Sequence, residues 1–280
     1  MSNSGASRLL VSIHARAVQI HHSAREIRSK TKRIYDRMLR ESRYLDSNNF
    51  EIIHTEDLGR LYSLYDSEFF SGMLTSLIRD VHQTELRFRL SHRMTAAAGK
   101  TIRTRRIVPG PRGPVARTDY EIAVSTLLLF QTFSDPGQTA IVCGIECRDR
   151  LDALLRIFEH EAIHLLEMLL WGDSSCDAPN YQTLASRIFG HQGVRHELIT
   201  PHARAASEFT LRVGDHVRFE FEGKILRGIL NRITRRASVL VPSPKGEVYS
   251  NGGCYLKYYV PLEALTREDA GDPAVHSSAD

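Results

Sequence analysis

Several features that would place a chain in a familiar class are scarce or missing here. The 280 residues include only four cysteines, and no two of them form a Cys-x-x-Cys pair. So few thiols exclude a disulfide scaffold and fit a reducing compartment, and the missing pairs exclude a zinc ribbon. No apolar run reaches the roughly 20 residues of a membrane span, and the N-terminus lacks the basic and apolar regions of a signal peptide. We therefore expect a cytoplasmic protein with no membrane segment.

Neither kind of charge dominates the chain as a whole. The formal net charge is +4, and hydrophobic and charged residues make up 42% and 25% of the sequence. These proportions are typical of globular proteins. A chain of this length can form one large domain or two smaller ones.

The stretch with the clearest chemical meaning is Phe158–Glu167, which holds the pattern His-Glu-x-x-His within an apolar, helix-forming run. Residues four apart on an α-helix project from nearly the same face, about 6 Å apart along the axis. His160 and His164 can therefore hold one zinc ion between their imidazoles. The neighbouring Glu161 is the candidate catalytic residue, because its carboxylate can take a proton from a zinc-bound water. The pattern predicts one Zn²⁺ per chain.

The helix that carries this pattern is expected to be buried. Apolar residues recur around its whole circumference, at Leu151, Leu154, Leu155, Phe158, Ile163, Leu165, Leu166, Leu169 and Leu170. A helix that is apolar on all sides lies in a core, where unpaired polar groups are unfavourable. The two histidines and the glutamate therefore need partners, and a metal ion supplies one. We expect the helix to extend from about Asp149 to Gly172.

Positive charge is concentrated in two segments. Residues 8–45 form a basic helical stretch with an apolar stripe, and its cations are Arg25, Arg28, Lys30, Lys32, Arg33, Arg37, Arg40 and Arg43. Between Arg87 and Arg117 there are nine Lys or Arg residues and no acidic residue. Such segments either solvate the surface of the fold or contact the phosphates of a nucleic acid. The candidate nucleic-acid contacts in the second segment are Arg103, Arg105 and Arg106.

The periodicity divides the chain into regions. Residues 1–50 form the basic helical segment, and residues 51–205 mix helical patterns with short alternating stretches. The expected strands cover residues 85–90, 101–107 and 120–125. Between the last two, the composition of residues 109–114, rich in Pro and Gly, predicts a loop.

Residues 210–267 have a pattern of their own. About five short alternating segments favour a small SH3-like barrel. Arg235 and Arg236 are among its cations, and the mixture of cations with aromatic residues suits a nucleic acid or a peptide. Residues 268–280 are rich in Asp, Ala, Gly, Pro and Ser and are expected to form a disordered tail.

Five motifs occur in a fixed order between residues 55 and 200. They are Phe69-Phe70-x-Gly72-x-Leu74, Ser91–Gly99, Glu121–Ser125, His160-Glu161-x-x-His164 and Phe189-Gly190-His191. Their order and spacing resemble those of the SprT-like zinc metallopeptidases, which include the Spartan proteases. The resemblance implies an α+β fold, with a zincin-like domain of helices and a short antiparallel sheet, followed here by the barrel. It also implies an intracellular peptidase that acts on proteins and associates with DNA, at the nucleoid if the source is bacterial.

The third zinc ligand is left open. In the family it comes from a His-Gly-x-x-aromatic motif after the active-site helix, and counting back from Tyr181 places Asp177 at the histidine position. Its neighbour Cys176 is favoured by chemistry, because a thiolate binds zinc more tightly than a lone carboxylate. Glu167, one turn beyond His164, is a further candidate. Three ligands from one straight helix make poor tetrahedral geometry, so support of a histidine suits Glu167 better.

Two functions follow from these residues. In the first, the protein is a zinc metallopeptidase in which two histidines and Cys176 or Asp177 bind the metal, and Glu161 is the base. In the second, it is a non-catalytic nucleic-acid-binding protein with a structural zinc. If Cys176 and Asp177 both bound the metal, or if Glu167 completed the shell, no position would remain for water. The coordination shell therefore distinguishes the two functions.

Overall fold

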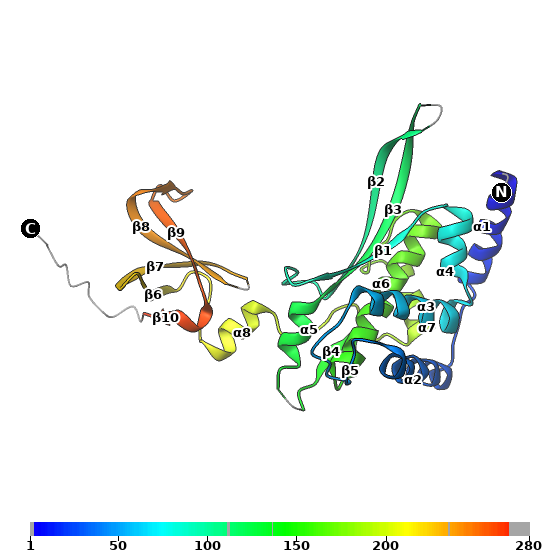
Figure 1. Ribbon diagram of the computed structural model, residues 1–280, viewed down its shortest axis with the longest axis horizontal. Helices are drawn as coiled ribbons and strands as arrows, with labels where there is room; N and C mark the ends of the chain where they lie inside the picture. The colour runs from blue at the N-terminus through cyan, green and yellow to red at the C-terminus, as the bar shows by residue number, and fades with distance from the viewer. Residues whose placement is uncertain (1–2, 111–112, 136, 235, 269–280) are drawn as a thin grey trace, which may run out of the picture. The chain divides into compact units, whose positions relative to one another are not determined.

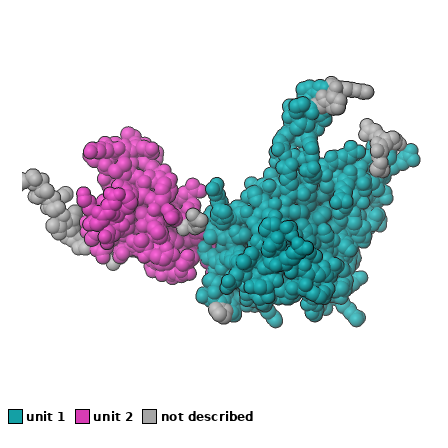
Figure 2. Space-filling model, in the orientation of Figure 1, with its two compact units in different colours: residues 1–198 teal, residues 199–280 magenta. Residues whose placement is uncertain are grey.

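The chain folds into two compact units. The computed structural model describes residues 3–110, 113–135, 137–234 and 236–268. The units are Met1–Leu198 and Ile199–Asp280, coloured separately in Figure 2, and Figure 1 shows the elements of each. The fold class is α+β, with helices and three small sheets among the described residues. Arg235 and the expected tail from residue 269 onwards lie outside the described residues.

The helices of the first unit surround one long buried helix. They are α1 (Asn3–Ala17), α2 (Ala24–Glu41), α3 (Thr55–Phe70), α4 (Met73–Ser76), the π-helix η1 (Leu77–Val81), α5 (Thr126–Thr132), α6 (Arg150–Trp171) and α7 (Pro179–Phe189). α6 carries the His-Glu-x-x-His pattern and is buried on most sides. The Asp149 side chain caps its N-terminus, and Gly172, with φ of 82°, ends it. No helix in the described part of the chain is long and apolar enough to cross a membrane.

A three-stranded sheet packs against α6. Its strands are β1 (Leu86–Ser91), β2 (Gly99–Gly110) and β3 (Gly113–Ser125), in the order β1-β3-β2. β2 and β3 are antiparallel, but β1 and β3 are parallel, so the sheet is mixed where an antiparallel one was predicted. The difference arises because β3 inserts between the two earlier strands. β2 therefore forms one edge of this sheet.

The β2–β3 hairpin is longer than the composition predicts. Within the loop expected at 109–114, Pro109 pairs with Pro114 and Gly110 pairs with Gly113, so both strands continue into that segment. Proline is tolerated at such an edge because its missing N–H leaves no inner ladder bond unmade. In Figure 1 the outer half of the hairpin extends beyond the helices of its unit.

A second hairpin lies beside the start of α6. It consists of β4 (Ala140–Val142) and β5 (Ile145–Cys147). The segment 192–197 runs along β4, where the Cys143 amide donates to the Arg195 carbonyl at 2.8 Å and the Glu197 amide donates to the Ile141 carbonyl at 2.7 Å. These bonds fix the turn that contains Cys143.

The basic N-terminal helices belong to the first unit. α1 and α2 place Ile13, Ala17, Ile34 and Met38 in the same core as α6. Four cations of α2 form ion pairs: Lys32 with Asp36, Arg33 with Glu68, and both Arg37 and Arg40 with Glu41. Part of the positive charge of this segment is therefore neutralised within the unit.

The second unit is built on a five-stranded sheet. Its elements are α8 (Pro201–Glu208), β6 (His216–Phe221), β7 (Lys224–Ile233), β8 (Ala237–Val248), β9 (Cys254–Val260), the 3-10 helix η2 (Leu262–Ala264) and β10 (Thr266–Arg267). The strand order is β10-β6-β7-β8-β9, and one face buries Val217, Phe219, Leu230, Val239 and Val260. The edge strands β9 and β10 do not pair with each other in the described residues, so the predicted barrel is not closed. β10, with two residues, is too short to close it.

Candidate metal centre

α6 brings the two predicted histidines together. His160 and His164 are one turn apart, and their Nε2 atoms lie 3.2 Å from each other. The ring centres are 4.8 Å apart and the rings are inclined by 69°. Two nitrogens bound tetrahedrally to one zinc ion, each at about 2.0–2.1 Å, lie about 3.4 Å apart. The spacing of the two Nε2 atoms therefore fits a shared metal ion.

Both imidazoles are neutral at ordinary pH. Burial lowers the pKa of His160 to about 3, with help from the neighbouring His164, and burial lowers the pKa of His164 to about 4. A metal-binding histidine must be neutral, because the lone pair on its nitrogen forms the bond. Each ring is therefore already in the protonation state that a ligand needs.

A chain of hydrogen bonds fixes the His164 ring. Its Nδ1 lies 2.7 Å from the Ser174 hydroxyl, which donates to the Glu167 carboxylate at 2.5 Å. The Asn180 amide donates to the other oxygen of Glu167 at 2.6 Å. Because the Ser174 proton goes to Glu167, the hydroxyl must accept from Nδ1–H of His164. This arrangement leaves the Nε2 lone pair of His164 free for a metal.

His160 is held from two other elements. Its Nδ1 lies 3.5 Å from the Sγ of Cys143, in the turn between β4 and β5. Its carbonyl accepts a hydrogen bond from the Tyr181 hydroxyl of α7 at 2.9 Å. The Tyr181 ring also packs on both imidazoles, with its centre 5.1 Å from that of His160 and 4.5 Å from that of His164. Tyr181 thus limits the movement of both candidate ligands.

Cys176 provides the third donor. Its Sγ and the ring nitrogens of His160 and His164 all lie within 4.8 Å of one another. Asp177 is exposed and is not part of this group, and the carboxylate of Glu167 is occupied by Ser174 and Asn180. Among the described residues, three donors of the kinds that zinc prefers therefore converge. Three protein ligands leave one tetrahedral position for water, as in catalytic zinc sites.

Glu161 lies beside the cluster with its carboxylate against β2. The side chain is buried, and the Thr101 hydroxyl lies 2.7 Å from a carboxylate oxygen and 3.0 Å from the Glu161 carbonyl. Burial raises the pKa of Glu161 to about 7, and the hydrogen bond from Thr101 partly offsets this rise. A carboxyl group that titrates near neutral pH can both accept and return a proton.

Gly99 lies two residues before Thr101, on the same face of β2, and has no side chain. A Cβ atom at Gly99 would lie 2.5, 2.7 and 2.9 Å from three atoms of the Glu161 side chain. Gly99 and Thr101 therefore form a seat for this carboxylate, which we call the Glu161 seat. Held there, Glu161 is not among the donors that converge within 4.8 Å.

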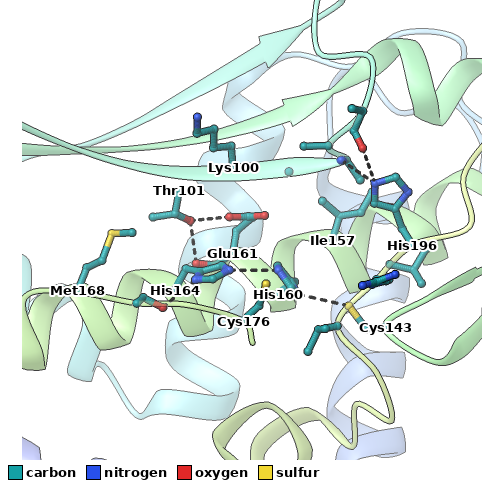
Figure 3. Close-up of a pocket in the computed structure, with 18 residues that line it drawn as sticks. Lys100, Thr101, Cys143, Ile157, His160, Glu161, His164, Met168, Cys176 and His196 are labelled. Carbon is teal, nitrogen blue, oxygen red and sulfur yellow. Dashed lines mark hydrogen bonds between the residues drawn. The ribbon is translucent and has the colours of Figure 1, made fainter. Parts of the chain in front are cut away.

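These side chains line one cavity, shown in Figure 3. Its volume is about 390 Å³, and its walls are α6, residues 96–101 at the start of β2, the β4–β5 turn, the segment 194–196, and Ser174 and Cys176 of the loop after α6. The His196 ring accepts a hydrogen bond from the Ala98 amide at 3.1 Å, which ties this segment to the start of β2. The edge of β2 thus borders the cavity where it passes Glu161.

The basic residues predicted to contact nucleic acid do not share one surface. Arg103 and Arg105 lie on one face of β2 and Arg106 on the other, because side chains alternate along a strand. Arg236 is exposed and belongs to the second unit. The predicted nucleic-acid contacts therefore have to be assigned to separate surfaces before a binding surface can be defined.

Three supporting residues have no signal of their own in the sequence. Thr101, Cys143 and Ser174 are separated from their partners by 60, 17 and 10 residues respectively. The strand pattern from residue 101 onwards indicates on which face of the strand Thr101 lies. It does not indicate which helix covers that face.

Comparisons of the chain with protein-family models, with curated proteins and with solved structures find no match. The functional conclusion therefore depends on the chemistry of the cavity.

Proposed function

We propose that the protein is a zinc-dependent metallopeptidase of the SprT-like type that acts on proteins. The observation that carries the proposal is the convergence of His160, His164 and Cys176, with Glu161 held beside them. These three residues would hold the ion. A zinc ion bound there would acidify a water molecule and polarise a peptide carbonyl.

The residues around the cluster have distinct roles in this proposal. Glu161 accepts a proton from the attacking water and transfers it to the amine that leaves when the C–N bond breaks. The Glu161 seat keeps the carboxylate close enough to do so without making it a fourth ligand. The free edge of β2 offers backbone groups to which an extended substrate can pair as an added strand, next to the cavity.

The alternative, a non-catalytic nucleic-acid-binding protein with a structural zinc, has less support. It requires a shell closed by protein ligands. Asp177 is exposed, and Glu167 is engaged by Ser174 and Asn180. Neither candidate for a fourth ligand therefore lies in the cluster.

The finer assignment of the fold is part of the same proposal. A buried His-Glu-x-x-His helix beneath a sheet with a free edge supports a zincin-like first unit. The meander β6–β9, followed by η2 and by the return of β10 to β6, supports an SH3-like second unit. Association with DNA inside the cell is inferred from the resemblance and from the basic segments.

The experiment that tests the proposal separates metal binding from proton transfer. We expect one zinc per chain by elemental analysis, and Glu161→Gln should retain the metal while losing cleavage of a labelled unfolded protein. Asp177→Asn is the matched control, because it makes the same chemical change at an exposed carboxylate outside the cluster. Full cleavage by Glu161→Gln would refute the role of Glu161. A metal-free protein whose cleavage ignores chelators would refute the proposal as a whole.

A further inference from the structure

The cavity extends well beyond the candidate metal centre. α6 lines it with Ile157, His160, Glu161, His164 and Met168, which share one face of the helix. From the first of these to the last, the helix rises about 16 Å. In Figure 3, Ile157 and Met168 lie on opposite sides of Glu161. The cavity volume of about 390 Å³ is many times the roughly 30 Å³ of one water molecule, so a metal ion and its water leave room for side chains of a substrate.

β2 runs beside α6 in the same direction. Thr101 contacts Glu161 near the middle of the cavity. Farther along β2, the guanidinium of Arg103 lies 3.4 Å from the place that a Cβ atom of Gly172 would occupy, at the C-terminal end of α6. The start of β2 therefore borders the half of the cavity that contains Ile157.

Two residues of β2 turn their backbone groups to the free edge of the sheet. The Ser125 amide donates to the Ala98 carbonyl at 2.8 Å, so the backbone of Ala98 faces β3. Backbone groups alternate along an antiparallel strand, and those of Gly99 and Thr101 therefore face outward. A substrate strand that pairs there would direct the side chains opposite Gly99 and Thr101 towards α6, and the one between them away from it. The side chain opposite Gly99 lies nearer the half of the cavity that contains Ile157.

That half of the cavity ends in an apolar wall. The wall consists of Ile157 from α6, Val142 from β4 and Val194 from the segment 192–197. Ile157 and Val142 are buried, and Val194 is half-buried. The hydrogen bonds that tie the segment to β4 and to the start of β2 hold the wall in place. We call this part of the cavity the apolar end.

The polar groups near the apolar end offer little to a polar side chain. The Sγ of Cys143 lies against the His160 ring, and one nitrogen of the His196 ring accepts a hydrogen bond from the start of β2. The other nitrogen of His196 is buried from solvent. A polar side chain placed there would lose its hydrogen bonds to water without a replacement. Arg195 also lines the cavity, but its side chain is exposed, so an acidic side chain would have to pair with it in solvent.

We propose that the apolar end is a specificity pocket, in which Val142, Ile157 and Val194 contact a large apolar side chain next to the scissile bond. The inference rests on the proposed peptidase function and names its substrate class: extended protein segments with leucine, isoleucine, methionine or phenylalanine at that position. The residue that pairs opposite Gly99 carries this side chain. In apolar pockets of enzymes, one methylene group changes kcat/KM by about 10- to 200-fold, so the preference is large enough to measure.

The test changes the size of the pocket in two directions. Val194→Phe fills the apolar end, and Val194→Ala widens it. Val213→Phe is the matched control, because it makes the same change at an exposed valine of the second unit. Circular dichroism and zinc content check that each variant is folded and loaded with metal.

The first measurement is cleavage of a library of unstructured peptides, in which mass spectrometry identifies the residues on both sides of each broken bond. The unmodified chain should select large apolar residues at one of these positions. There, kcat/KM should be at least about tenfold higher for leucine than for alanine. Val194→Phe should reverse this preference in favour of alanine, and Val194→Ala should shift it towards phenylalanine. Val213→Phe should cleave like the unmodified chain.

The second measurement is binding without cleavage. Fluorescence anisotropy follows labelled peptides that carry leucine or alanine at the selected position, with Glu161→Gln as the protein. If the library yields no product, the same peptides are tested with leucine or alanine at every position. The leucine peptide should bind at least about tenfold more tightly, and addition of Val194→Phe should remove the difference.

The two measurements separate the pocket from the peptidase function. Cleavage without an apolar preference, or with a preference for aspartate that Arg195→Gln abolishes, would overturn the pocket and leave the peptidase function standing. Equal binding of the leucine and alanine peptides would also overturn the pocket. Leucine-selective binding that depends on Val194, in a chain that cleaves no peptide, would support the pocket and refute the peptidase function.

Discussion

Two segments of the first unit support α6 at the cavity, and they act on different residues. The first residues of β2 hold Glu161, through the Thr101 hydroxyl and the empty position at Gly99. The loop between α6 and α7 acts on the metal side, where Cys176 completes the cluster and Ser174 orients His164. Because the base and the ligands are supported by different segments, proton transfer and metal binding should respond to different substitutions.

Replacement of Cys176 tests the metal-binding residues. Its effect, on zinc affinity, is expected to be the largest of those considered. Cys176→Ala should weaken zinc binding by more than the 10- to 100-fold that is typical for loss of a supporting residue, because it removes a ligand. Asp177→Ala, at the next position, should leave zinc affinity unchanged. Competition with a chromophoric chelator measures both. If instead only Asp177→Ala lost zinc, the third ligand would be Asp177.

Gly99→Ala tests the β2 side. The added methyl group would overlap the Glu161 side chain, and displacement of a catalytic group by about 1 Å can reduce the rate roughly 100-fold. We expect that loss in kcat/KM with a full zinc content. Gly59→Ala is the control, since its Cβ would meet only the Phe88 ring at an ordinary 3.7 Å. Normal turnover in Gly99→Ala would show that the seat does not constrain Glu161.

Ser174→Ala should have a moderate effect, again on the metal side. Without its hydroxyl, the link from His164 to Glu167 is broken, and supporting partners of this kind contribute about 10- to 100-fold to metal affinity. At saturating zinc we expect kcat/KM close to that of the unmodified chain. Ser175→Ala, at an exposed neighbouring position, provides the comparison. A fall in kcat/KM that added zinc does not restore would show that Ser174 also affects proton transfer by Glu161. Metal binding and proton transfer would then not be supported independently.

The local part of this site could be predicted from the sequence. His160, Glu161 and His164 lie on one helix, and helical periodicity alone determines that the two rings meet. The capping residues Asp149 and Gly172 likewise mark the ends of α6 because capping depends on immediate neighbours. Cys176 is close to the helix in sequence, and its chemistry distinguishes it from Asp177.

The remaining part depends on contacts that no local pattern encodes. Thr101 reaches Glu161 only because β2 lies at the sheet edge next to α6, and the parallel pairing of β1 with β3 produces that order. The continuation of the hairpin through Pro109 and Pro114 could not be predicted because the composition of that segment is typical of a loop. The division of the arginines between two faces follows from the register of the same hairpin.

Thr101→Val is expected to have the smallest effect on activity, and the pH dependence of activity measures that effect best. The hydrogen bond from Thr101 lowers the pKa of Glu161, so its loss should raise that pKa above the present value of about 7. A general base acts when deprotonated, so activity should rise with pH through this pKa, and the rise should move to higher pH in the variant. Near neutral pH we expect activity to fall about tenfold, and the fall becomes smaller in alkaline solution.

Thr101→Ser should restore the original pH profile because it retains the hydroxyl, whereas a steric role for Thr101 would make Val the better replacement. An unshifted profile in Thr101→Val, with zinc fully bound, would mean that the β2 segment positions Glu161 by shape alone.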